Sequence, residues 1–447
     1  MGTVSKDQAN QILGKVLRLA KAPGTDCIAS LSANRHGNTR FAVNEISSSA
    51  DVEKQSLSVT IQIGKRQATA STNQLDATAL ADVVVRATRM AKLAPENPEA
   101  MPPLGRQVYR AAAGASDPAT ANLTPAARAK TVGAALALAK EAQISGYYEH
   151  AARISALASS QGMRATHEHT TVDLRVTART EDGTGSGWGG GTSHRAADLD
   201  GGALAKIAVD KARSSAKPTR LDPGRYTVVL EPAAVSDLFG WLYGALGARR
   251  ADEGRSFFSK PGGGTRIGEK LFPEWVTVKS DPTDPQLTSR PFDGEGFPVA
   301  PTTWIDKGTV KALTYSRYWA QKQGKPPTGS PSGWILEGGD AARAAKVLAT
   351  RDDLIKGVKR GVLITRFWYL RSVDPQTLLV TGLTRDGVYL IENGAVTRPV
   401  NNFRFNESPV QMLGKSDAMT PGVISQWVRV PALRTHEFNL ASISEAV

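Results

Sequence analysis

The sequence predicts an α+β protein, in which a mixed α and β N-terminal domain is followed by a largely antiparallel β C-terminal domain. The chain has 447 residues, too many for one ordinary core, since domains typically hold about 100–200 residues. A polar stretch with two prolines, SSAKPTRLDPG at 214–224, separates halves of different texture. We therefore expect one domain over residues 1–217 and a second over residues 222–447.

The N-terminal half alternates between helical and strand patterns. An apolar stripe formed by Ile12, Leu13, Val16, Leu17 and Ala20 predicts a first amphipathic helix. Alternating apolar residues in LSVTIQI (57–63) and TVDLRVTA (171–178) predict half-buried strands, and Ala-rich stretches at 76–94 and 126–142 predict helices between them. Strands of this kind, without regular βαβ units, indicate hairpins.

The C-terminal half reads as strands separated by turns. The expected turns fall at 306–308 (DKG), 386–387 (DG) and 393–394 (NG), dipeptides that tolerate positive φ. A loop is expected at 324–333. The run YTVVLEPAAVSDLFGWLYGAL (226–246) predicts a strand that leads into a helix, with one apolar stripe formed by Val235, Leu238, Phe239, Leu242 and Leu246.

Composition narrows the class of protein. No segment approaches the roughly 20 apolar residues that cross a bilayer, and the N-terminus lacks the apolar core of a secretory signal. One cysteine excludes an internal disulfide framework and a thiolate metal cluster. We expect a cytoplasmic protein without a membrane partner. The net charge of +13 is spread along the chain with no basic run, which favours a solvated basic surface over a nucleic-acid site.

Three local patterns could carry chemistry. His167 and His169 share one face of a predicted strand, a spacing that suits metal ligands, but that face is polar and no third ligand is visible nearby. Asp293 and Glu295 lie on a turn bounded by prolines, where they could hold a divalent ion, act as acid and base, or fix the loop through hydrogen bonds. GTGSGWGGG (183–191) matches a dinucleotide fingerprint weakly, because no helix follows at once, and we expect a flexible loop.

Several motifs in order resemble the TldD/PmbA family of metalloproteases, also called modulators of gyrase. They are GRYTVVLEP followed by a helix, PFDGEGFP, IDKGTVKALTYSRYWAQKQG, PPTG and TGLTRDGVYLIENGAVTRPVNNFRFNES. In the N-terminal half, TRFAVNEI, ATASTNQLD and GSGW agree as well. The resemblance covers nearly the whole chain.

The resemblance implies a particular kind of subunit. TldD-like members carry H-E-x-x-x-H on the helix after this strand, where two histidines bind zinc and the glutamate can act as base. Here the corresponding positions fall around residues 240–245, GWLYGA, and no histidine occurs between His194 and His436. The chain therefore resembles the PmbA or TldE kind, with no cofactor and no catalytic residue of its own.

The implied role is that of a partner. Such a subunit would form a heterodimer with a zinc-binding TldD-like subunit, or a homodimer, and would shape a cavity for peptides or unfolded proteins. Candidate cavity or partner contacts in the matching segments are Asp293, Glu295, Tyr315, Arg385, Asp386 and Arg404. Two alternatives stay open: a self-sufficient hydrolase that uses His167 and His169 with Asp293 and Glu295, and a basic binding protein without a protease partner.

Overall fold

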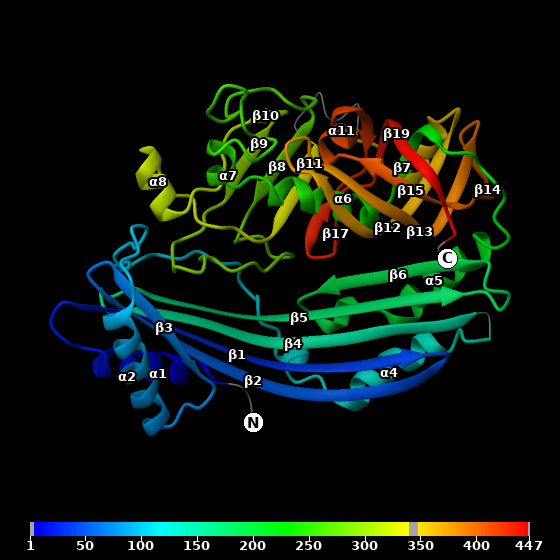
Figure 1. Ribbon diagram of the computed structural model, residues 1–447. Helices are drawn as coiled ribbons and strands as arrows, with labels where there is room; N and C mark the ends of the chain where they lie inside the picture. The colour runs from blue at the N-terminus through cyan, green and yellow to red at the C-terminus, as the bar shows by residue number, and fades with distance from the viewer. Residues whose placement is uncertain (1–3, 141, 339–346, 446–447) are drawn as a thin grey trace.

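The computed structural model describes residues 4–140, 142–338 and 347–445. It confirms an α+β fold built on three mostly antiparallel sheets (Figure 1). The first sheet has the order β3-β2-β1-β4-β5-β6, and every neighbouring pair is antiparallel. Its strands are β1 (Thr25–Ala42), β2 (Glu45–Ile63), β3 (Arg66–Thr72), β4 (Gln143–Ser159), β5 (Arg164–Arg179) and β6 (Ser186–Ser193).

Helices cover one face of the first sheet, and the C-terminal part of the chain lies over the other face (Figure 1). Side chains alternate along β5, so Val172, Leu174 and Val176 pack into the helix-covered core, whereas Thr171 and Asp173 point to the opposite, polar face. The helices of this half are α1 (Lys6–Leu19), α2 (Ala77–Leu93), α3 (Pro118–Ala121), α4 (Pro125–Leu136), the 3-10 turn η1 (Ala196–Asp198) and α5 (Gly201–Ser214).

The predicted strands and helices of this half are mostly confirmed. Ser5 caps α1 with a reciprocal capping box, and Leu13 and Val16 of the predicted stripe are fully buried. The Ala-rich helix expected over 126–142 is shorter than predicted, because α4 ends at Leu136 and Gln143 already begins β4. Residue 141 of that expected helix lies outside the described residues.

The second sheet has the order β10-β9-β8-β11-β18-β17. The third sheet has the order β12-β7-β19-β15-β13-β14 and closes on itself, because β12 pairs with β13 as well as with β7. The second sheet contains β8 (Val276–Ser280), β9 (Thr302–Asp306), β10 (Thr309–Val310), β11 (Trp334–Gly338), β17 (Val423–Ser425) and β18 (Val428–Val430). The third contains β7 (Gly224–Leu230), β12 (Arg360–Asp374), β13 (Leu379–Glu392), β14 (Ala395–Pro399), β15 (Asn402–Glu407), β19 (Leu433–Ser444) and the side strand β16 (Ser416–Met419).

The predicted strand-to-helix junction at 226–246 is confirmed as β7 followed by α6 (Pro232–Gly244). All five residues of its predicted apolar stripe are fully buried. They share one core with Phe367, Phe403, Phe405 and Phe438 of the closed sheet. The remaining helices of this half are α7 (Ala248–Asp252), α8 (Arg317–Gln323), α10 (Arg351–Lys356) and α11 (Pro409–Gly414).

Two expected turns are confirmed and one is wrong. Lys307 and Gly308 join β9 to β10, and Asn393 and Gly394 join β13 to β14, all four with positive φ. The expected turn at 386–387 lies inside β13 instead and forms a bulge. Residues 325–333 form neither helix nor strand, as expected of a loop.

The glycine-rich run is also different from the prediction. Residues 186–193 form strand β6 rather than a flexible loop. A Cβ added at Gly187 would lie 2.1 Å from the carbonyl oxygen of Ala208, and a Cβ added at Gly189 would lie 2.2 Å from the carbonyl oxygen of Leu204. Glycine is therefore needed because the backbone of α5 packs directly on this strand.

Among the described residues, no helix combines the length and the apolar character needed to cross a bilayer.

Candidate functional site

Helix α6 follows β7 at the position where the resemblance places metal ligands. The ring of Tyr243 stacks on that of Trp334, with centroids 5.0 Å apart and planes inclined by 10°. Phe239 meets Tyr243 edge to face at 5.2 Å. The side chains of residues 240–245 include no His, Cys, Asp or Glu, so this turn of the helix offers aromatic packing and no metal ligand.

Asp237 is the one acidic residue of α6. Its Oδ2 accepts the backbone N–H of Phe367 at 3.3 Å, and its Oδ1 accepts the side-chain amide of Gln426 at 3.0 Å. Burial raises the pKa of Asp237 to about 6, against the lowering effect of Gln426 and of Arg366. A single engaged carboxylate does not fit a zinc site, and no group of three or more His, Cys, Asp or Glu that could hold a metal occurs among the described residues.

A bulge in β13 positions the buried carboxylate of Asp386. Asp386 (φ +58°) and Gly387 (φ +125°) are both in the left-handed region, and the pairing of β12 with β13 slips at this point. Thr365 of β12 donates its hydroxyl to the carbonyl of Asp386 at 2.9 Å. Bulges commonly redirect a side chain next to a functional site, and here the bulge turns Asp386 toward the first sheet.

Asp386 joins the closed sheet to the first sheet. The Ser186 hydroxyl, on β6, donates to Asp386 Oδ1 at 2.6 Å, and Arg366 Nη1 donates to Oδ2 at 3.2 Å. Arg385 lies 3.8 Å away. The Asp386 side chain is only 1% exposed, so this contact between the two halves of the molecule is buried. The nearby arginines balance the charge of the carboxylate there.

Arg366, Arg385 and Asp386 line a cavity of about 790 Å³, which we call the arginine cavity. It lies where the ends of β1 and β2 and the strands β4 to β6 face β12 and β13. Arg366 is sandwiched between aromatic rings, with its guanidinium carbon 4.8 Å from the Trp188 ring centroid and 5.4 Å from that of Trp368. The polar and aromatic residues that line the cavity are Arg40, Phe41, Ser47, Ser48, Ser145, Tyr147, Arg175, Thr177, Trp188, Arg366, Trp368, Arg385 and Asp386.

The structure brings only two of the six candidate contacts into this cavity, Arg385 and Asp386. Arg404 lies exposed on β15 and is not among the lining residues. Tyr315 is 5% exposed, and burial raises its pKa. The backbone of Tyr315 is held by Thr328, whose hydroxyl accepts its N–H at 2.9 Å.

Asp293 and Glu295 fix a loop. Asp293 Oδ1 accepts the backbone N–H groups of Glu295 and Phe297, both at 2.9 Å, and burial raises the pKa of this carboxyl. Glu295 pairs instead with Arg317 at 3.3 Å. Each carboxylate therefore has its own local partner. This arrangement favours the interpretation that the two residues fix the loop.

His167 and His169 stack on β5 with ring centroids 5.1 Å apart. Burial lowers the pKa of both, to about 3 for His169, with further lowering from neighbouring positive groups that include Arg290. One ring nitrogen of each, His167 Nε2 and His169 Nδ1, has no hydrogen-bond partner among the described residues. The arrangement keeps two neutral imidazoles beside arginines, and the described residues supply no third metal ligand.

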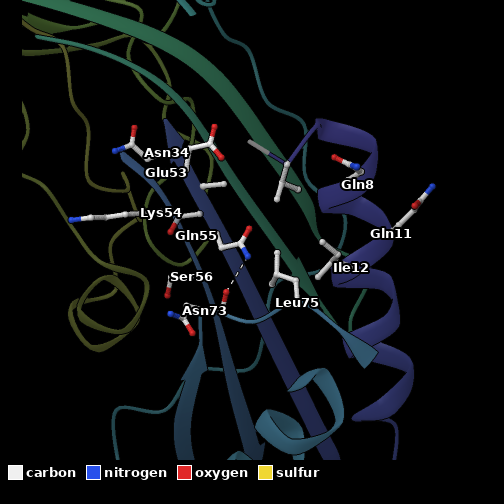
Figure 2. Close-up of a pocket in the computed structure, with 13 residues that line it drawn as sticks. Gln8, Gln11, Ile12, Asn34, Glu53, Lys54, Gln55, Ser56, Asn73 and Leu75 are labelled. Atoms are coloured by element: carbon white, nitrogen blue, oxygen red, sulfur yellow. Dashed lines mark hydrogen bonds between the residues drawn. The ribbon is translucent and has the colours of Figure 1, made fainter. Parts of the chain in front are cut away.

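Two further sites contribute less chemistry. A larger hollow of about 1140 Å³ lies between α1 and the strands β1 and β2 (Figure 2). Apart from Glu53 and Lys54 it is lined by uncharged groups such as Gln8, Gln55 and Asn73, so it lacks convergent charge.

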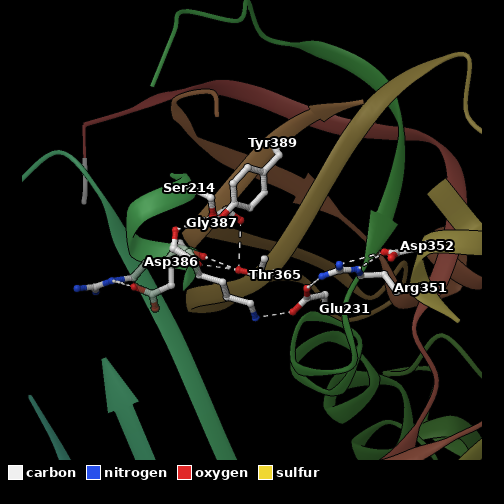
Figure 3. A network of polar contacts seen from close by, with 10 residues as sticks. Ser214, Glu231, Arg351, Asp352, Thr365, Asp386, Gly387 and Tyr389 are labelled. Atoms are coloured by element: carbon white, nitrogen blue, oxygen red, sulfur yellow. Dashed lines mark hydrogen bonds and ion pairs between the residues drawn. The ribbon is translucent and has the colours of Figure 1, made fainter. Parts of the chain in front are cut away.

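Elsewhere, Glu231 at the start of α6 accepts Lys211 at 2.6 Å and Arg351 at 2.7 Å, which ties α5 to the C-terminal part. Figure 3 shows Arg351 between Glu231 and Asp352, and Thr365 beside the Asp386-Gly387 bulge. Because the Glu231 carboxylate is paired on both oxygens, we read this network as structural.

Sequence reasoning missed three residues of the arginine cavity: Trp188, Arg366 and Trp368. A usable signal was present in RFWYL (366–370). Alternation places Arg366 and Trp368 on one face of β12, while Phe367 packs inside the closed sheet against Phe405.

Comparison with family models places this α+β fold among metallopeptidase-like proteins. Residues 223–442 match the model of the PmbA/TldA metallopeptidase C-terminal domain, and residues 96–216 match that of the central domain. The chain belongs to the PmbA/TldD family.

Curated relatives and solved structures agree with this assignment. A metalloprotease of Methanothermobacter thermautotrophicus is 26% identical over 288 residues, 59% of this chain and 59% of that protein. The metalloprotease PmbA of Escherichia coli O157:H7 is 24% identical over 204 residues, 44% of this chain and 41% of that protein. The matched regions thus span less than two thirds of these relatives.

The similarity to solved structures extends over the whole fold. The structure of TldE from Thermococcus kodakarensis superposes with a TM-score of 0.82 at 16% identity, covering 97% of this chain and 99% of that one. A Thermotoga maritima protein named as a modulator of a DNA gyrase gives a TM-score of 0.84 at 18% identity, covering 96% and 99%. At these identities the similarity concerns the fold.

Proposed function

We propose that this chain is the non-metal-binding, TldE/PmbA-like subunit of a cytoplasmic peptide-processing metalloprotease complex. In this proposal a TldD-like partner supplies the zinc, and the present chain shapes the cavity that receives the peptide. The observation that carries the proposal is the content of α6. Where a metal-binding member needs two histidines and a glutamate, this helix presents Gly240, Trp241 and Ala245, and its face is filled by the stack of Tyr243 on Trp334.

A helix with this composition supports a partner role rather than independent hydrolysis. Zinc needs three protein ligands in a catalytic site, and Asp237 alone, already engaged by Gln426 and the Phe367 amide, cannot replace them. The fold is nevertheless retained around α6, since its apolar stripe is fully buried in the closed sheet. Retention of the helix without ligands is what a supporting subunit requires.

The test compares the purified chain with a pair obtained by co-expression with an H-E-x-x-x-H family member. We expect the chain alone to contain no stoichiometric zinc and to leave unfolded peptides intact, and the co-purified pair to contain zinc and to cleave them. The matched control is a pair in which the partner's motif glutamate is replaced by Gln, which should keep assembly and abolish cleavage. Stoichiometric zinc or chelator-sensitive hydrolysis in the isolated chain would refute the proposal and favour the His167 and His169 alternative.

A further inference from the structure

The arginine cavity has an excess of positive charge that its own residues do not neutralise. Four arginines and one carboxylate, Asp386, are among the described residues that line it. Asp386 already has its partners, Ser186 on Oδ1 and Arg366 on Oδ2, and it is buried behind them. Arg175 is also paired, with Asp173 at 2.7 Å. Arg40 and Arg385 remain with much of their donor capacity, since each guanidinium carries five N–H groups.

Aromatic rings hold these guanidinium groups in place. Arg385 lies 4.9 Å from the ring centroid of Trp368, and Arg40 lies 5.8 Å from that of Tyr147. When a guanidinium stacks on a ring, the N–H groups along its edge stay free to donate. That edge can bind a carboxylate with two parallel hydrogen bonds. A ring contact that restricts an arginine side chain reduces the conformational entropy lost on binding.

The cavity is also accessible. Trp368 is 43% exposed, and Arg40 is exposed near the end of β1. Its volume of about 790 Å³ falls within the range of about 300–1,000 Å³ usual for small-ligand sites. A site of this size suits the end of a peptide better than an extended strand of nucleic acid, which requires phosphate contacts along a longer surface.

We propose that the arginine cavity binds carboxylate groups of peptides, either the free C-terminal carboxylate or acidic side chains next to it. Arg40 and Arg385 supply the donors for such carboxylates, and the exposed part of Trp368 packs against the neighbouring peptide. Asp386 acts as a positioning residue, because its pairs with Arg366 and Arg385 fix the guanidinium groups. This ligand class deepens the proposed function and takes its biological meaning from it, but the site itself can be tested on the isolated chain.

The test measures fluorescence anisotropy of a short fluorescein-labelled peptide that ends in two glutamates and a free carboxylate. Matched peptides replace the glutamates with glutamines or carry a C-terminal amide. We expect the acidic peptide to bind more tightly than the neutral amidated one, and Arg385→Ala and Arg40→Ala each to raise Kd about 10- to 100-fold, the loss of a charge-assisted hydrogen bond. Arg89→Ala is the control, since Arg89 is exposed on α2, on the opposite side of the first sheet, and it should leave Kd unchanged.

The outcomes separate the possibilities. If only the amide weakens binding, the C-terminal carboxylate is the ligand, and if only the glutamines weaken it, acidic side chains are; either result supports the site. Equal binding of acidic and neutral peptides, or equal effects of Arg385→Ala and Arg89→Ala, would overturn it. So would displacement of the peptide by a single-stranded oligonucleotide at lower concentration than by unlabelled peptide. Because Arg40 is exposed, its variant keeps the test valid even if Arg385→Ala fails to fold.

The two proposals can fail separately. Tight binding of the acidic peptide to the isolated chain, with a co-expressed pair that cleaves nothing, would retain the site and reject the subunit role. A pair that cleaves peptides while the isolated chain binds acidic and neutral peptides equally would retain the subunit role and reject the site.

Discussion

Gly189→Ala is predicted to weaken the packing of α5 on β6. An alanine Cβ at this position would lie 2.2 Å from the carbonyl oxygen of Leu204 and 3.1 Å from its carbonyl carbon. The obstacle is backbone, so no rotamer change can relieve it, and helix and strand must separate by about 1 Å to reach normal contact distance. Gly187 packs against the same helix at Ala208. A displacement of α5 at Gly189 therefore also loosens its packing on β6 at Gly187.

The cost follows from what this contact buries. Helix α5 contributes Ala205, Ala208, Val209 and Ala212 to a core that they share with β5, and all four are 0–2% exposed. Overpacking of a tight site typically costs about 1–3 kcal/mol, and we expect the upper end, about 3 kcal/mol, because the backbone cannot adapt. The urea midpoint followed by circular dichroism should fall accordingly.

Gly133→Ala is the matched control for Gly189→Ala. Gly133 lies exposed inside α4, and an added Cβ would meet no heavy atom within 4 Å. Alanine is the better helix former there, so this variant should gain about 0.5–1 kcal/mol. The same chemical change is therefore expected to act with opposite sign at two positions. A Gly189→Ala midpoint equal to or above that of the wild type would refute the close-packing explanation of the glycine-rich strand.

Three further predictions concern stability. Asp386→Ala removes the buried carboxylate that pairs with Ser186 and Arg366, and should lower the free energy of unfolding in urea by about 3 kcal/mol. Ser186→Ala should lower it by about 1–2 kcal/mol. Costs near zero for both variants would contradict a stabilising contact between Asp386 and the first sheet. Tyr243→Ala should cost about 2–4 kcal/mol by removing the ring stacked on Trp334, and Tyr243→Phe, which keeps the ring, should cost much less. Burial and neighbouring His167 lower the pKa of His169 to about 3, so below pH 6.5 this histidine is protonated in the unfolded chain but stays neutral in the folded chain. The free energy of unfolding should therefore fall by about 2 kcal/mol between pH 6.5 and 5. His169→Gln should lessen that fall, and an unchanged dependence of stability on pH in this variant would contradict the prediction.

Sequence patterns predicted the elements that local rules determine. The stripe of α1, the alternation of β2 and β5, and the Asn393-Gly394 turn all depend on residues close in sequence. The two errors in element type, at 183–191 and at 386–387, arose where a distant segment decides the structure, whereas the helix expected over 126–142 was only too long. Glycine at every second position from 185 to 191 is itself a period of two, but glycine disfavours strands, and only the backbone of α5 makes it necessary. Asp386 and Gly387 have the chemistry of a turn, and pairing with Thr365 converts them into a bulge.

The same distinction applies to the candidate site. The resemblance identified Arg385 and Asp386 because they lie in a matching segment, but it could not relate them to Trp188, which is about 200 residues away in sequence and reaches them only when the first sheet packs on the closed sheet. It also suggested Arg404 and Tyr315, which the fold places outside the arginine cavity. A residue's place in a matching segment therefore predicts only that it corresponds to a position in the family. Which of these residues line one cavity is decided by how the two halves of the molecule pack together.

The distribution of polar groups bears on the proposed function. The interior of the closed sheet is filled by the apolar stripe of α6 and by Phe367, Phe405 and Phe438. Charge gathers instead one layer outward, where Arg366, Arg385 and Asp386 face the first sheet. Fixed guanidinium groups next to exposed aromatic surface can bind and orient a carboxylate but cannot activate water for amide hydrolysis without a base or metal. The proposed function accordingly gives recognition to this chain and bond cleavage to a TldD-like partner.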